Sequence, residues 1–440
     1  MTMAPANETA DETADRAAKN QRAGLPRLLP PVPGVPEDLR AHLARYGRPP
    51  YLGGPGLLIR GAEAAGLTGR GGAAFPVHRK LAIVAGARGR KVIVANGAES
   101  EPASRKDALL LRVAPNLVLD GLQLAAEAIG ATEAHLYLHP GLSQEIWRAL
   151  SQRAAVGIDW IDVTLTEAPP RFLAGQESAL VNRLGGGPAL PTFVPPRVSE
   201  RGLRGAATLV QNVETLAHLA LIARYGPRWF RALGTGQEPG SMLTTVYQAD
   251  GTSQVIEVEI GAPLRTLLAS QPEVPEAQAL LIGGFHGTWL PMAQAASLTL
   301  DNATLNTHGA ALGAGVIAAL PADRCGLVEA ARVARYLAAE SAGQCGPCLN
   351  GLPRMAAGLA ELAGRGHRRQ VRADLERWAG LVTGRGACNH PDGTVRFVAS
   401  ALTVFAAEIA VHAQGHCSAT SRRPFLPLPD GMPTTEDDWI

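Results

Sequence analysis

The sequence predicts a multidomain α/β + α protein with a mainly parallel sheet, a small second domain and a C-terminal four-helix bundle. Three observations support this fold class. The chain has 440 residues, more than one hydrophobic core usually accommodates. Short apolar runs alternate with helical patterns in its first half, whereas helical periodicity dominates from residue 321 onward. Its 46% hydrophobic and 18% charged residues are typical of a soluble globular protein.

The α/β domain is predicted over residues 36–235. Lys91–Ala95 (KVIVA) and Ala134–Leu138 (AHLYL) are short and apolar, as buried strands are. Asn116–Ile129, between them, has helical spacing. This β-α-β order predicts parallel strands joined by a helix.

A small α+β domain is predicted over residues 240–320. Ser241–Ala249 and Gln254–Ile260 alternate in polarity around an Asp-Gly turn, which indicates two strands. Pro263–Ala269 then has the pattern of one short helix.

Residues 321–418 are predicted to be helical. The first helix keeps one apolar face, formed by Leu327, Val328, Ala331, Ala334, Leu337 and Ala338. Three more helical segments follow: Met355–Leu362, Val371–Val382 and Val395–His412. Four such helices predict a bundle, with the cysteines at its loops.

The two ends of the chain differ from the rest. Residues 1–35 and 419–440 are polar and Pro-rich, so we predict a disordered N-terminal tail and a C-terminal tail that bury no core. The start lacks the apolar stretch of a secretory signal, and no run of 18 apolar residues predicts membrane insertion. A cytoplasmic location is expected, with attachment to the inner face of a membrane only through a partner.

The net charge of +2 gives no electrostatic reason to expect a nucleic-acid or acidic-lipid partner. All five cysteines lie in the last third of the chain. Clustered cysteines in a cytosolic protein indicate metal or redox chemistry rather than a disulfide framework.

Gly69–Phe75 (GRGGAAF) matches the glycine pattern of dinucleotide-binding loops. The strand that should precede such a loop is missing, because Leu58–Gly66 has the pattern of a helix. We therefore do not expect an ordinary Rossmann site here. Glycine amides can still approach a phosphate or a flat ring, with Arg70 and Lys80 as nearby positive charges. A tight turn between helices is the alternative interpretation.

Polar side chains follow the first predicted strand: Asn96, Glu99, Ser100 and Glu101. The carboxyl ends of strands in α/β sheets bind ligands, and such groups suit hydrogen bonds to ribityl, ribose or amide groups. Alternatively, they are turn and N-cap residues before a helix at 105–112.

Two later polar segments, Phe172–Leu180 and Gln211–Leu216, each have the pattern of a helix start with a capping residue. Taken together and in this order, the segments resemble the flavoprotein subunit of respiratory complex I and its relatives in NAD-reducing hydrogenases and formate dehydrogenases. The likeness covers about residues 57–415. Its motifs are GLTGRGGAAFP, NGAESEP followed by KD, LAGQESAL, VPPRVSERGLRG, QNVETL and LGAGVI.

The resemblance implies a Rossmann-like domain that binds FMN, with a dinucleotide stacked over the flavin, and a β-grasp module at 240–320. The FMN cradle would consist of Gly69, Arg70, Gly71, Gly72, Lys80, Asn96, Glu99, Ser100, Gln211, Asn212 and Thr215. The dinucleotide would lie near Phe75, Glu101, Phe172, Gly175 and Glu177. Hydride passes directly between stacked rings, so no side-chain base is required, and Glu101 and Glu177 would only position the ligand.

The resemblance also implies an iron–sulfur cluster at Cys345, Cys348 and Cys388. The family holds a 4Fe-4S cluster with four cysteines, but Ala342 stands at the first ligand position here. The fourth iron would need another group, such as His390 or Cys417, or solvent, and a three-iron cluster is also compatible with three thiolates.

Considered without the resemblance, the cysteines favour a zinc site instead. Cys345, Cys348, Cys388 and His390 form a Cys₃His set, which is common in structural zinc sites. With the resemblance, a 4Fe-4S cluster becomes the expectation, and buried cysteines without a metal are a third interpretation. Cys325, away from this loop, is expected to be a packing residue.

Several positions depart from the family pattern. Ala98 replaces an aspartate, Phe172 a tyrosine, Gln176 a glutamate and Ala74 a glycine. Ile83 and Arg197 align with two aromatic residues that would enclose adenine, so that Phe75 alone remains. Weaker NADH binding follows, unless Arg197 stacks on adenine or meets the 2′-phosphate of NADPH.

The leading hypothesis is an oxidoreductase of the NADH dehydrogenase or diaphorase type. Electrons would pass from NAD(P)H through FMN and the three-cysteine cluster to a ferredoxin-like subunit or a membrane-bound reductase. One alternative is a non-catalytic scaffold or ligand-binding relative. Another is a flavin reductase with a structural Cys₃His zinc.

Overall fold

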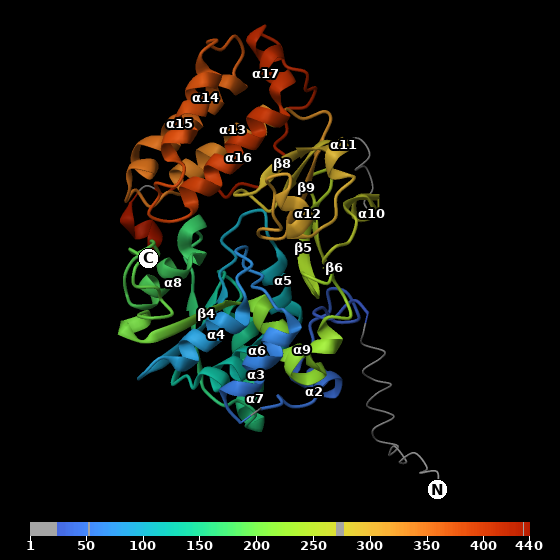
Figure 1. Ribbon diagram of the computed structural model, residues 1–440, viewed down its shortest axis with the longest axis vertical. Helices are drawn as coiled ribbons and strands as arrows, with labels where there is room; N and C mark the ends of the chain where they lie inside the picture. Colours follow the sequence, from blue (N-terminus) through green and yellow to red (C-terminus); the bar gives the residue numbers. More distant parts are fainter. Residues whose placement is uncertain (1–23, 52, 270–276, 434) are drawn as a thin grey trace.

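The protein is a multidomain α/β molecule, as predicted. Figure 1 shows an α/β domain at the bottom, a second sheet beside it and a helical region at the top. This computed structural model describes residues 24–51, 53–269, 277–433 and 435–440.

The first sheet is parallel and four-stranded. Its order is β3 (Val163–Glu167), β2 (Glu133–Leu138), β1 (Lys91–Gly97) and β4 (Ala207–Asn212). The predicted strands at 91–95 and 134–138 are therefore confirmed. The helices of this part are α2 (Leu39–Tyr46), α3 (Pro55–Ala65), α4 (Val77–Gly86), α5 (Lys106–Val113), α6 (Pro115–Ile129), α7 (Ser143–Val156), α8 (Glu177–Leu184) and α9 (Val213–Phe230).

The strand order contains a topological switch point. From β1 the chain moves outward to β2 and β3, and then returns to place β4 on the other side of β1. Near the carboxyl ends of these two neighbouring strands, Asn96 of β1 and Asn212 of β4 are paired in register. Loops diverge at such a point and leave a crevice at the carboxyl edge of the sheet, where ligands of open α/β sheets bind.

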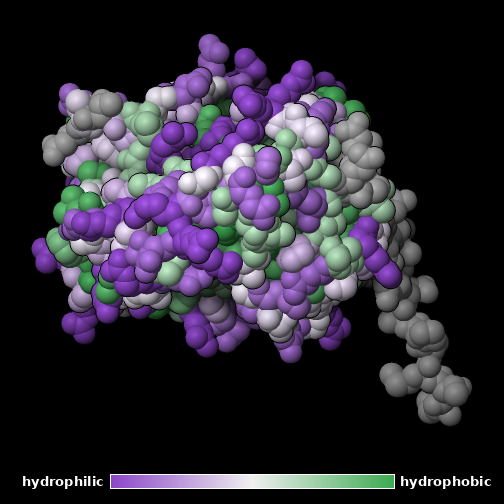
Figure 2. Space-filling model, turned by 90° about the horizontal axis from the view of Figure 1, so that it is seen from above, coloured by the Kyte–Doolittle hydropathy of each residue, from purple (hydrophilic) through white to green (hydrophobic). Residues whose placement is uncertain are grey.

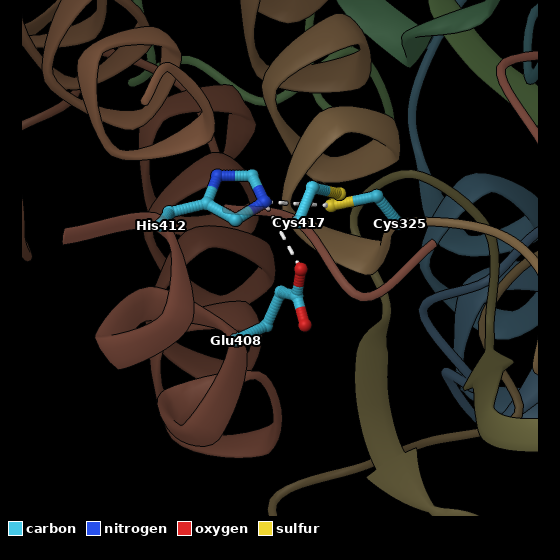
Figure 3. Close-up of side chains that lie close together, drawn as sticks. All are labelled: Cys325, Glu408, His412 and Cys417. Carbon is cyan, nitrogen blue, oxygen red and sulfur yellow. Dashed lines mark hydrogen bonds and ion pairs between the residues drawn. The ribbon is translucent and has the colours of Figure 1, made fainter. Parts of the chain in front are cut away.

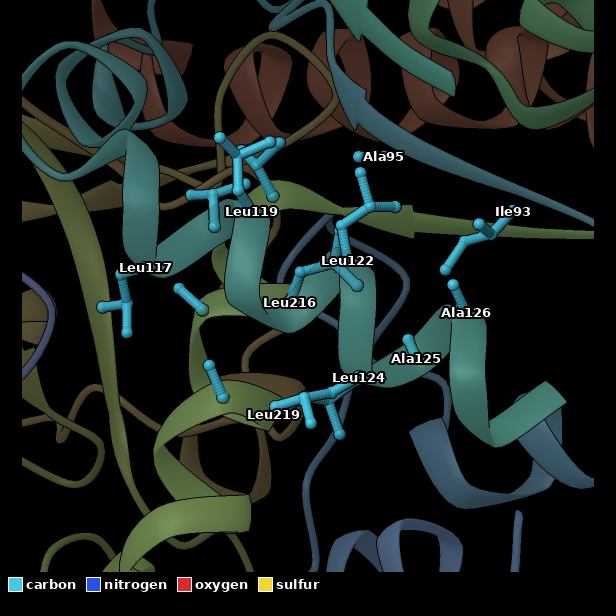
Figure 4. Packing of buried hydrophobic residues seen from close by; sticks show 14 of the residues in the cluster. Ile93, Ala95, Leu117, Leu119, Leu122, Leu124, Ala125, Ala126, Leu216 and Leu219 are labelled. Carbon is cyan, nitrogen blue, oxygen red and sulfur yellow. The ribbon is translucent and has the colours of Figure 1, made fainter. Parts of the chain in front are cut away.

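Helix α6 is the core of this domain, since nearly all its residues are buried. Figure 4 shows its leucines and alanines packed between Ile93 and Ala95 of β1 and Leu216 and Leu219 of α9. The two helices approach closely at Gly121, where a Cβ atom would lie 1.9 Å from the carbonyl oxygen of Leu216. Glycine at this position therefore sets how near α9 lies to α6.

The second sheet is mixed and five-stranded. Its order is β6 (Ser253–Glu259), β5 (Ser241–Tyr247), β9 (Val316–Pro321), β7 (Ala277–Ile282) and β8 (Thr288–Pro291). The predicted hairpin is confirmed, because β5 and β6 are antiparallel. Three short helices accompany the sheet: α10 (Leu264–Ala269), as predicted, α11 (Met292–Ala295) and α12 (Asn302–Asn306).

The helical region differs from the predicted four-helix bundle in one respect. Its helices are α13 (Gly326–Ala339), α14 (Leu352–Ala363), α15 (Val371–Val382), α16 (His390–Val404) and α17 (Ala406–Ala413). The single helix expected over Val395–His412 is divided at Phe405, and its two parts meet at 71°. The buried Phe405 ring packs against Trp289 of the second sheet, so the apolar pattern continues through a bend.

The expected tails are packed where the structure describes them. Residues 1–23 of the N-terminal tail lie outside the described residues, but Leu28 is fully buried in the α/β core. In the C-terminal segment 419–440, Phe425, Leu426 and Trp439 are buried in the helical core. The prediction that the two tails bury no core is therefore wrong for residues 24–35 and 419–440. Their widely spaced apolar side chains lack the periodic pattern that would have indicated burial.

Within the described residues, no single helix has the length and apolar character to cross a membrane, although two sharply bent helix pairs reach that threshold together. Both pairs contribute to the packed cores of the molecule. Seen over the helical end, the surface is largely hydrophilic with small interspersed apolar areas (Figure 2).

Gly121→Ala is expected to destabilise the protein by about 1–3 kcal/mol or more, because the added methyl group overlaps the backbone of α9. Urea unfolding measures this change. Gly380→Ala in α15 is the matched control, since its methyl group meets open space and helix propensity alone predicts a gain of up to about 1 kcal/mol. Equal stability of Gly121→Ala and the wild type would contradict the proposed close packing.

Candidate functional site

A pocket lies at the carboxyl edge of the parallel sheet, at the switch point. It gathers the glycine loop after α3, the end of β1, the start of α5, the segment before α8, the N-cap of α9 and the loop before β9. Its lining consists of Arg70, Gly71, Asn96, Glu99, Ser100, Glu101, Ser104, Lys106, Asp107, Gly175, Asn212 and Ala314. Segments that are distant in the sequence are thus brought together as the resemblance implied.

The glycine loop is closed by a bond from the Gly69 amide to the Phe75 carbonyl, at 2.9 Å. Its Arg70 amide donates to Thr215 Oγ1 at 2.9 Å, which ties the loop to the first turn of α9. Gly71 lies against Asn212, because a Cβ on this glycine would be 3.4 Å from the Asn212 Cβ. The loop therefore presents backbone rather than side chains.

The Arg70 side chain does not supply the positive charge expected of it. The buried guanidinium donates to the carbonyl oxygens of Thr68, Pro239 and Ser241. Burial lowers its pKa, with Glu214 opposing this effect. Arg70 thus connects the glycine loop to the second sheet.

Glu99 has the capping role that the sequence left open as an alternative. Its carboxylate accepts from the amides of Asp107 and Ala108, both at 2.9 Å, and from Ser104 Oγ at 2.7 Å. These donors lie at the start of α5, where amides have no partner within the helix. The residue adopts a positive φ of 43°, so the backbone turns sharply to aim this carboxylate at the helix.

Lys106 is the buried cation of the pocket, and the sequence analysis did not assign it to the site. Its Nζ lies 2.6 Å from Asp107 Oδ1 and 2.9 Å from Glu214 Oε2. Asn212 Nδ2 donates to Asp107 Oδ2 at 2.6 Å, and Glu214 Oε1 accepts from the Leu243 amide at 2.9 Å. This charge network joins α5, α9 and β5 directly beneath the pocket.

The pKa values of the two carboxylates in this network shift in opposite directions. Burial would raise the pKa of Glu214, but Lys106 and His218 bring it down to about 2. Burial raises the pKa of Asp107 to about 7 despite Lys106. Burial thus acts on Asp107 more strongly than the attraction of Lys106 does, whereas for Glu214 the groups that lower the pKa together outweigh burial.

Glu101 is a second acidic group in the pocket with a raised pKa. Burial raises this pKa to about 7, against two backbone hydrogen bonds that lower it. Those bonds come from the amides of Ala103, at 3.1 Å, and Phe285, at 2.9 Å. Glu101 therefore joins the pocket to the loop after β7.

Gly175 contributes close packing to the pocket. Its carbonyl accepts from Asn96 Nδ2 at 2.9 Å, and an added Cβ would lie 2.5 Å from Ser100 Oγ. The pocket thus needs a residue without a side chain here.

Some predicted site residues lie outside the pocket lining: Gly69, Gly72, Phe75, Lys80, Phe172, Glu177, Gln211 and Thr215. Lys80 Nζ pairs with Glu177 Oε1 at 2.6 Å and also donates to the Val210 carbonyl. The Gln211 side chain is buried beside the pocket residues, and its Nε2 has no hydrogen-bond partner.

The positions at which the family has aromatic residues near the dinucleotide lie partly at the surface and partly in the core. Phe75 and Ile83 are 42% and 47% exposed. Phe172 is buried instead, with its ring 4.7 Å from that of His286 and 5.6 Å from that of His390. In this structure Phe172 therefore packs between the α/β domain and the helical region rather than lining the pocket.

The predicted cysteine ligands lie close enough together to influence one another. Burial, together with the neighbouring Cys345 and Cys388 thiols, raises the pKa of Cys348 to about 12. Cys345 lies in the loop before the π-helical turn η4 (Pro347–Gly351), Cys348 lies within that turn, which leads into α14, and Cys388 precedes α16. The helical region thus brings the three predicted thiols to one end.

Neither predicted fourth ligand is available there. His390 is buried, and its Nδ1 and Nε2 are both engaged, with His286 Nε2 at 3.0 Å and the Leu337 carbonyl at 2.8 Å. Cys417 belongs to a different group of side chains, near Cys325. In this structure tertiary packing thus gives both residues neighbours other than the three predicted thiols.

The pocket residues that sequence reasoning missed are Ser104, Lys106, Asp107 and Ala314. The sequence did contain a signal for three of them. Lys106 and Asp107 are the Lys-Asp pair that follows NGAESEP, and Ala314 lies in the motif LGAGVI. The charge of Lys106 was recognisable, but its burial under the pocket was not.

Known proteins match this arrangement. A model of the Nuo51 FMN-binding domain matches residues 62–221, and a model of the NADH-ubiquinone oxidoreductase-F iron-sulfur binding region matches residues 329–412. The chain therefore carries an FMN-binding domain and an iron–sulfur region of the complex I type. This confirms the resemblance drawn from the motifs, which also implied FMN and a 4Fe-4S cluster.

Relatives of this type align over most of the chain. One of them, the NADH-quinone oxidoreductase F 2 subunit of Rhizobium meliloti (strain 1021), is 28% identical over 81% of this chain and 89% of its own length. The corresponding F protein of the Streptomyces coelicolor NADH-quinone oxidoreductase is 28% identical over 82% of this chain and 84% of its own length.

Two solved structures of an NAD+-reducing NiFe hydrogenase share the fold. The H2-reduced form has a TM-score of 0.74 and 27% identity over 82% of this chain, and the air-oxidised form 0.75 and 26% over 87%. The chain spans 62% and 65% of the length of these hydrogenase chains.

Glu101→Gln is expected to remove a pH dependence of stability. The folded pKa of about 7 lies above the ordinary 4.5, so stability is greatest at low pH and falls as pH rises from 4.5 to 7. The neutral amide cannot ionise, so the variant should lose roughly 1–3 kcal/mol less than the wild type across this window. Urea unfolding at pH 4.5 to 8 measures the difference. Parallel curves would contradict the raised pKa.

Proposed function

We propose that the chain is an NADH-oxidising electron-transfer flavoprotein. The observation that carries this proposal is the pocket at the switch point, which lies largely inside the residues matched by the FMN-binding model. The relatives are named as F subunits of NADH-quinone oxidoreductase and as NAD+-reducing hydrogenase. FMN supplies hydride acceptance from a nicotinamide and the release of single electrons.

The residues present fit an FMN group. Gly71 and Gly175 place no side chain in the pocket at their positions, and Lys106 places a positive charge beneath it. The buried Gln211 Nε2 has no partner and suits an acceptor atom of a ligand. Asn212 caps α9, whose first amides favour an anionic group nearby.

We propose that the predicted FMN residues bind FMN as the resemblance implies. Lys106 is added to this set, and Glu99 acts indirectly, by fixing the start of α5. Glu101 and Glu177 remain the residues proposed to position the dinucleotide, together with Phe75 and Gly175. The exposure of Phe75 suits a stacking surface, whereas the burial of Phe172 restricts it to supporting the site.

We also propose three domains. Residues 36–235 form the FMN-binding α/β domain, residues 240–320 a β-grasp module and residues 321–418 the helical bundle. The last unit would hold an iron–sulfur cluster at Cys345, Cys348 and Cys388. Ala342 still supplies no fourth thiolate, and a ferredoxin-like subunit or a membrane-bound reductase would accept the electrons.

Anaerobic purification with FMN in excess tests the function. A yellow-brown protein that retains FMN and iron, and whose flavin absorbance bleaches with NADH, supports the proposal. A colourless protein that retains neither would support the non-catalytic alternative, and zinc in place of iron at the three cysteines would support the zinc-containing flavin reductase. Comparison of NADH with NADPH tests the role of Arg197.

Gly71→Val is expected to weaken FMN binding by at least about tenfold, or about 1.4 kcal/mol, because its side chain would enter the pocket beside Asn212. Gly236→Val is the control, since nothing lies within 4 Å of a Cβ there. Flavin fluorescence titration measures the affinity. Unchanged FMN binding by a folded Gly71→Val variant would remove the glycine loop from the cradle.

Ala342→Cys is expected to complete the thiolate set. Iron content should rise from about three to about four per chain if the native cluster lacks one iron, with a matching change in the electron paramagnetic resonance spectrum. Leu349→Cys, at an exposed position beside Cys348, is the control for an added thiol. An identical spectrum and iron content in wild type and Ala342→Cys would contradict the three-thiolate site.

A further inference from the structure

A second group of metal-ligating side chains lies in the helical region, apart from the proposed cluster. It contains Cys325, Glu408, His412 and Cys417, and one ligand atom from each lies within 4.8 Å of all the others. Among the described residues this is the one such group of three or more. Figure 3 shows the four side chains pointing toward one another.

We propose that these four residues form a structural zinc site, which nothing in the family match assigns. Two thiolates, one imidazole and one carboxylate are a complete tetrahedral set for Zn²⁺. Cys325 Sγ lies 3.5 Å from His412 Nε2, which lies 3.0 Å from Glu408 Oε1. Ligand atoms around one zinc ion are separated by roughly 3–4 Å, given bonds of about 2.0–2.3 Å.

The hydrogen bonds of His412 favour a cation. Its Nδ1 lies 3.2 Å from the Leu362 carbonyl, which can only accept, so Nδ1 carries the proton. In the neutral ring, Nε2 then directs a lone pair at the Glu408 carboxylate and at Cys325. A metal ion between these atoms removes that conflict, and the carbonyl bond is the usual outer contact of a histidine ligand.

The carboxylate is also held from outside. Glu408 Oε1 accepts from the Ser418 amide at 2.9 Å, and Oε2 accepts from Ser418 Oγ. Ser418 directly follows Cys417, so the same turn that delivers the thiol orients the carboxylate. Glu408 and His412 are four residues apart on α17 and therefore share one face of that helix.

The charge around the group suits an anionic metal complex. Two thiolates and one carboxylate with Zn²⁺ carry one net negative charge. Arginines from separate segments line the adjoining cavity: Arg324, Arg365, Arg422 and Arg423. Their positive charges complement the net negative charge of such a complex.

The zinc would join three segments. Cys325 precedes α13, Glu408 and His412 lie on α17, and Cys417 lies just before the C-terminal segment 419–440, whose Phe425 and Leu426 pack into the helical core. The site thereby fixes the segment that the sequence suggested would be a free tail. Its role is structural, because four protein ligands leave no open position.

Metal analysis of anaerobically purified protein tests the proposal, with iron and zinc counted separately. The wild type should contain about one zinc ion per chain, and Cys325→Ser/Cys417→Ser should contain about tenfold less, with its iron unchanged. The matched control, Cys345→Ser/Cys348→Ser, should lose iron and keep zinc. Wild-type protein without iron thus argues against the cluster, and wild-type protein without zinc argues against this site.

Two further measurements keep the test decisive if the double variant does not fold. Apoprotein loaded with Co²⁺ should show the visible bands of tetrahedral cobalt with thiolate-to-metal charge transfer. Peptide mapping after thiol alkylation identifies the state of Cys325 and Cys417. A disulfide between them, free thiols in wild type without zinc, or zinc lost only from Cys345→Ser/Cys348→Ser would each overturn the proposal.

Discussion

The arrangement of the pocket depends on one buried charge network. Lys106 at the start of α5 bonds Asp107 and Glu214, and Glu214 in turn accepts from the backbone of β5. A lysine without these partners would be very costly to bury, and removing it would leave two buried acids unpaired. The network therefore fixes α5 and α9 relative to the second sheet, and the ends of β1 and β4 open between these helices.

Glu99 and Gly121 extend that constraint in two directions. The Glu99 carboxylate fixes the start of α5 from the end of β1, so the position of Lys106 follows from the strand. Gly121 lets α9 approach α6, which determines the depth of Asn212 and Thr215 beneath the glycine loop. Helix positions, rather than individual polar contacts, thus decide the shape of the crevice.

Periodicity and motif order predicted the strands β1 and β2, the hairpin of β5 and β6, several helices, including α6, α10, α13 and α15, and most of the pocket lining. The roles of charged residues were not predictable in the same way. Arg70 and Lys106 are both cations within the motifs, but only tertiary packing turns Arg70 toward the carbonyls of the second sheet and buries Lys106 under the pocket. His390 likewise follows Cys388 closely in sequence, and yet its ring nitrogens point to His286 and Leu337.

The C-terminal segment connects regions made at very different times during synthesis. Arg171, just before Phe172, pairs with Asp438, 267 residues later, and the Trp439 carbonyl accepts from Ala189 near α8. A nascent α/β domain leaves the ribosome long before these partners exist, and domains generally fold as units in that order. The seam between the α/β domain and the bundle can therefore close only after Asp438 and Trp439 have been translated, well after the α/β domain itself.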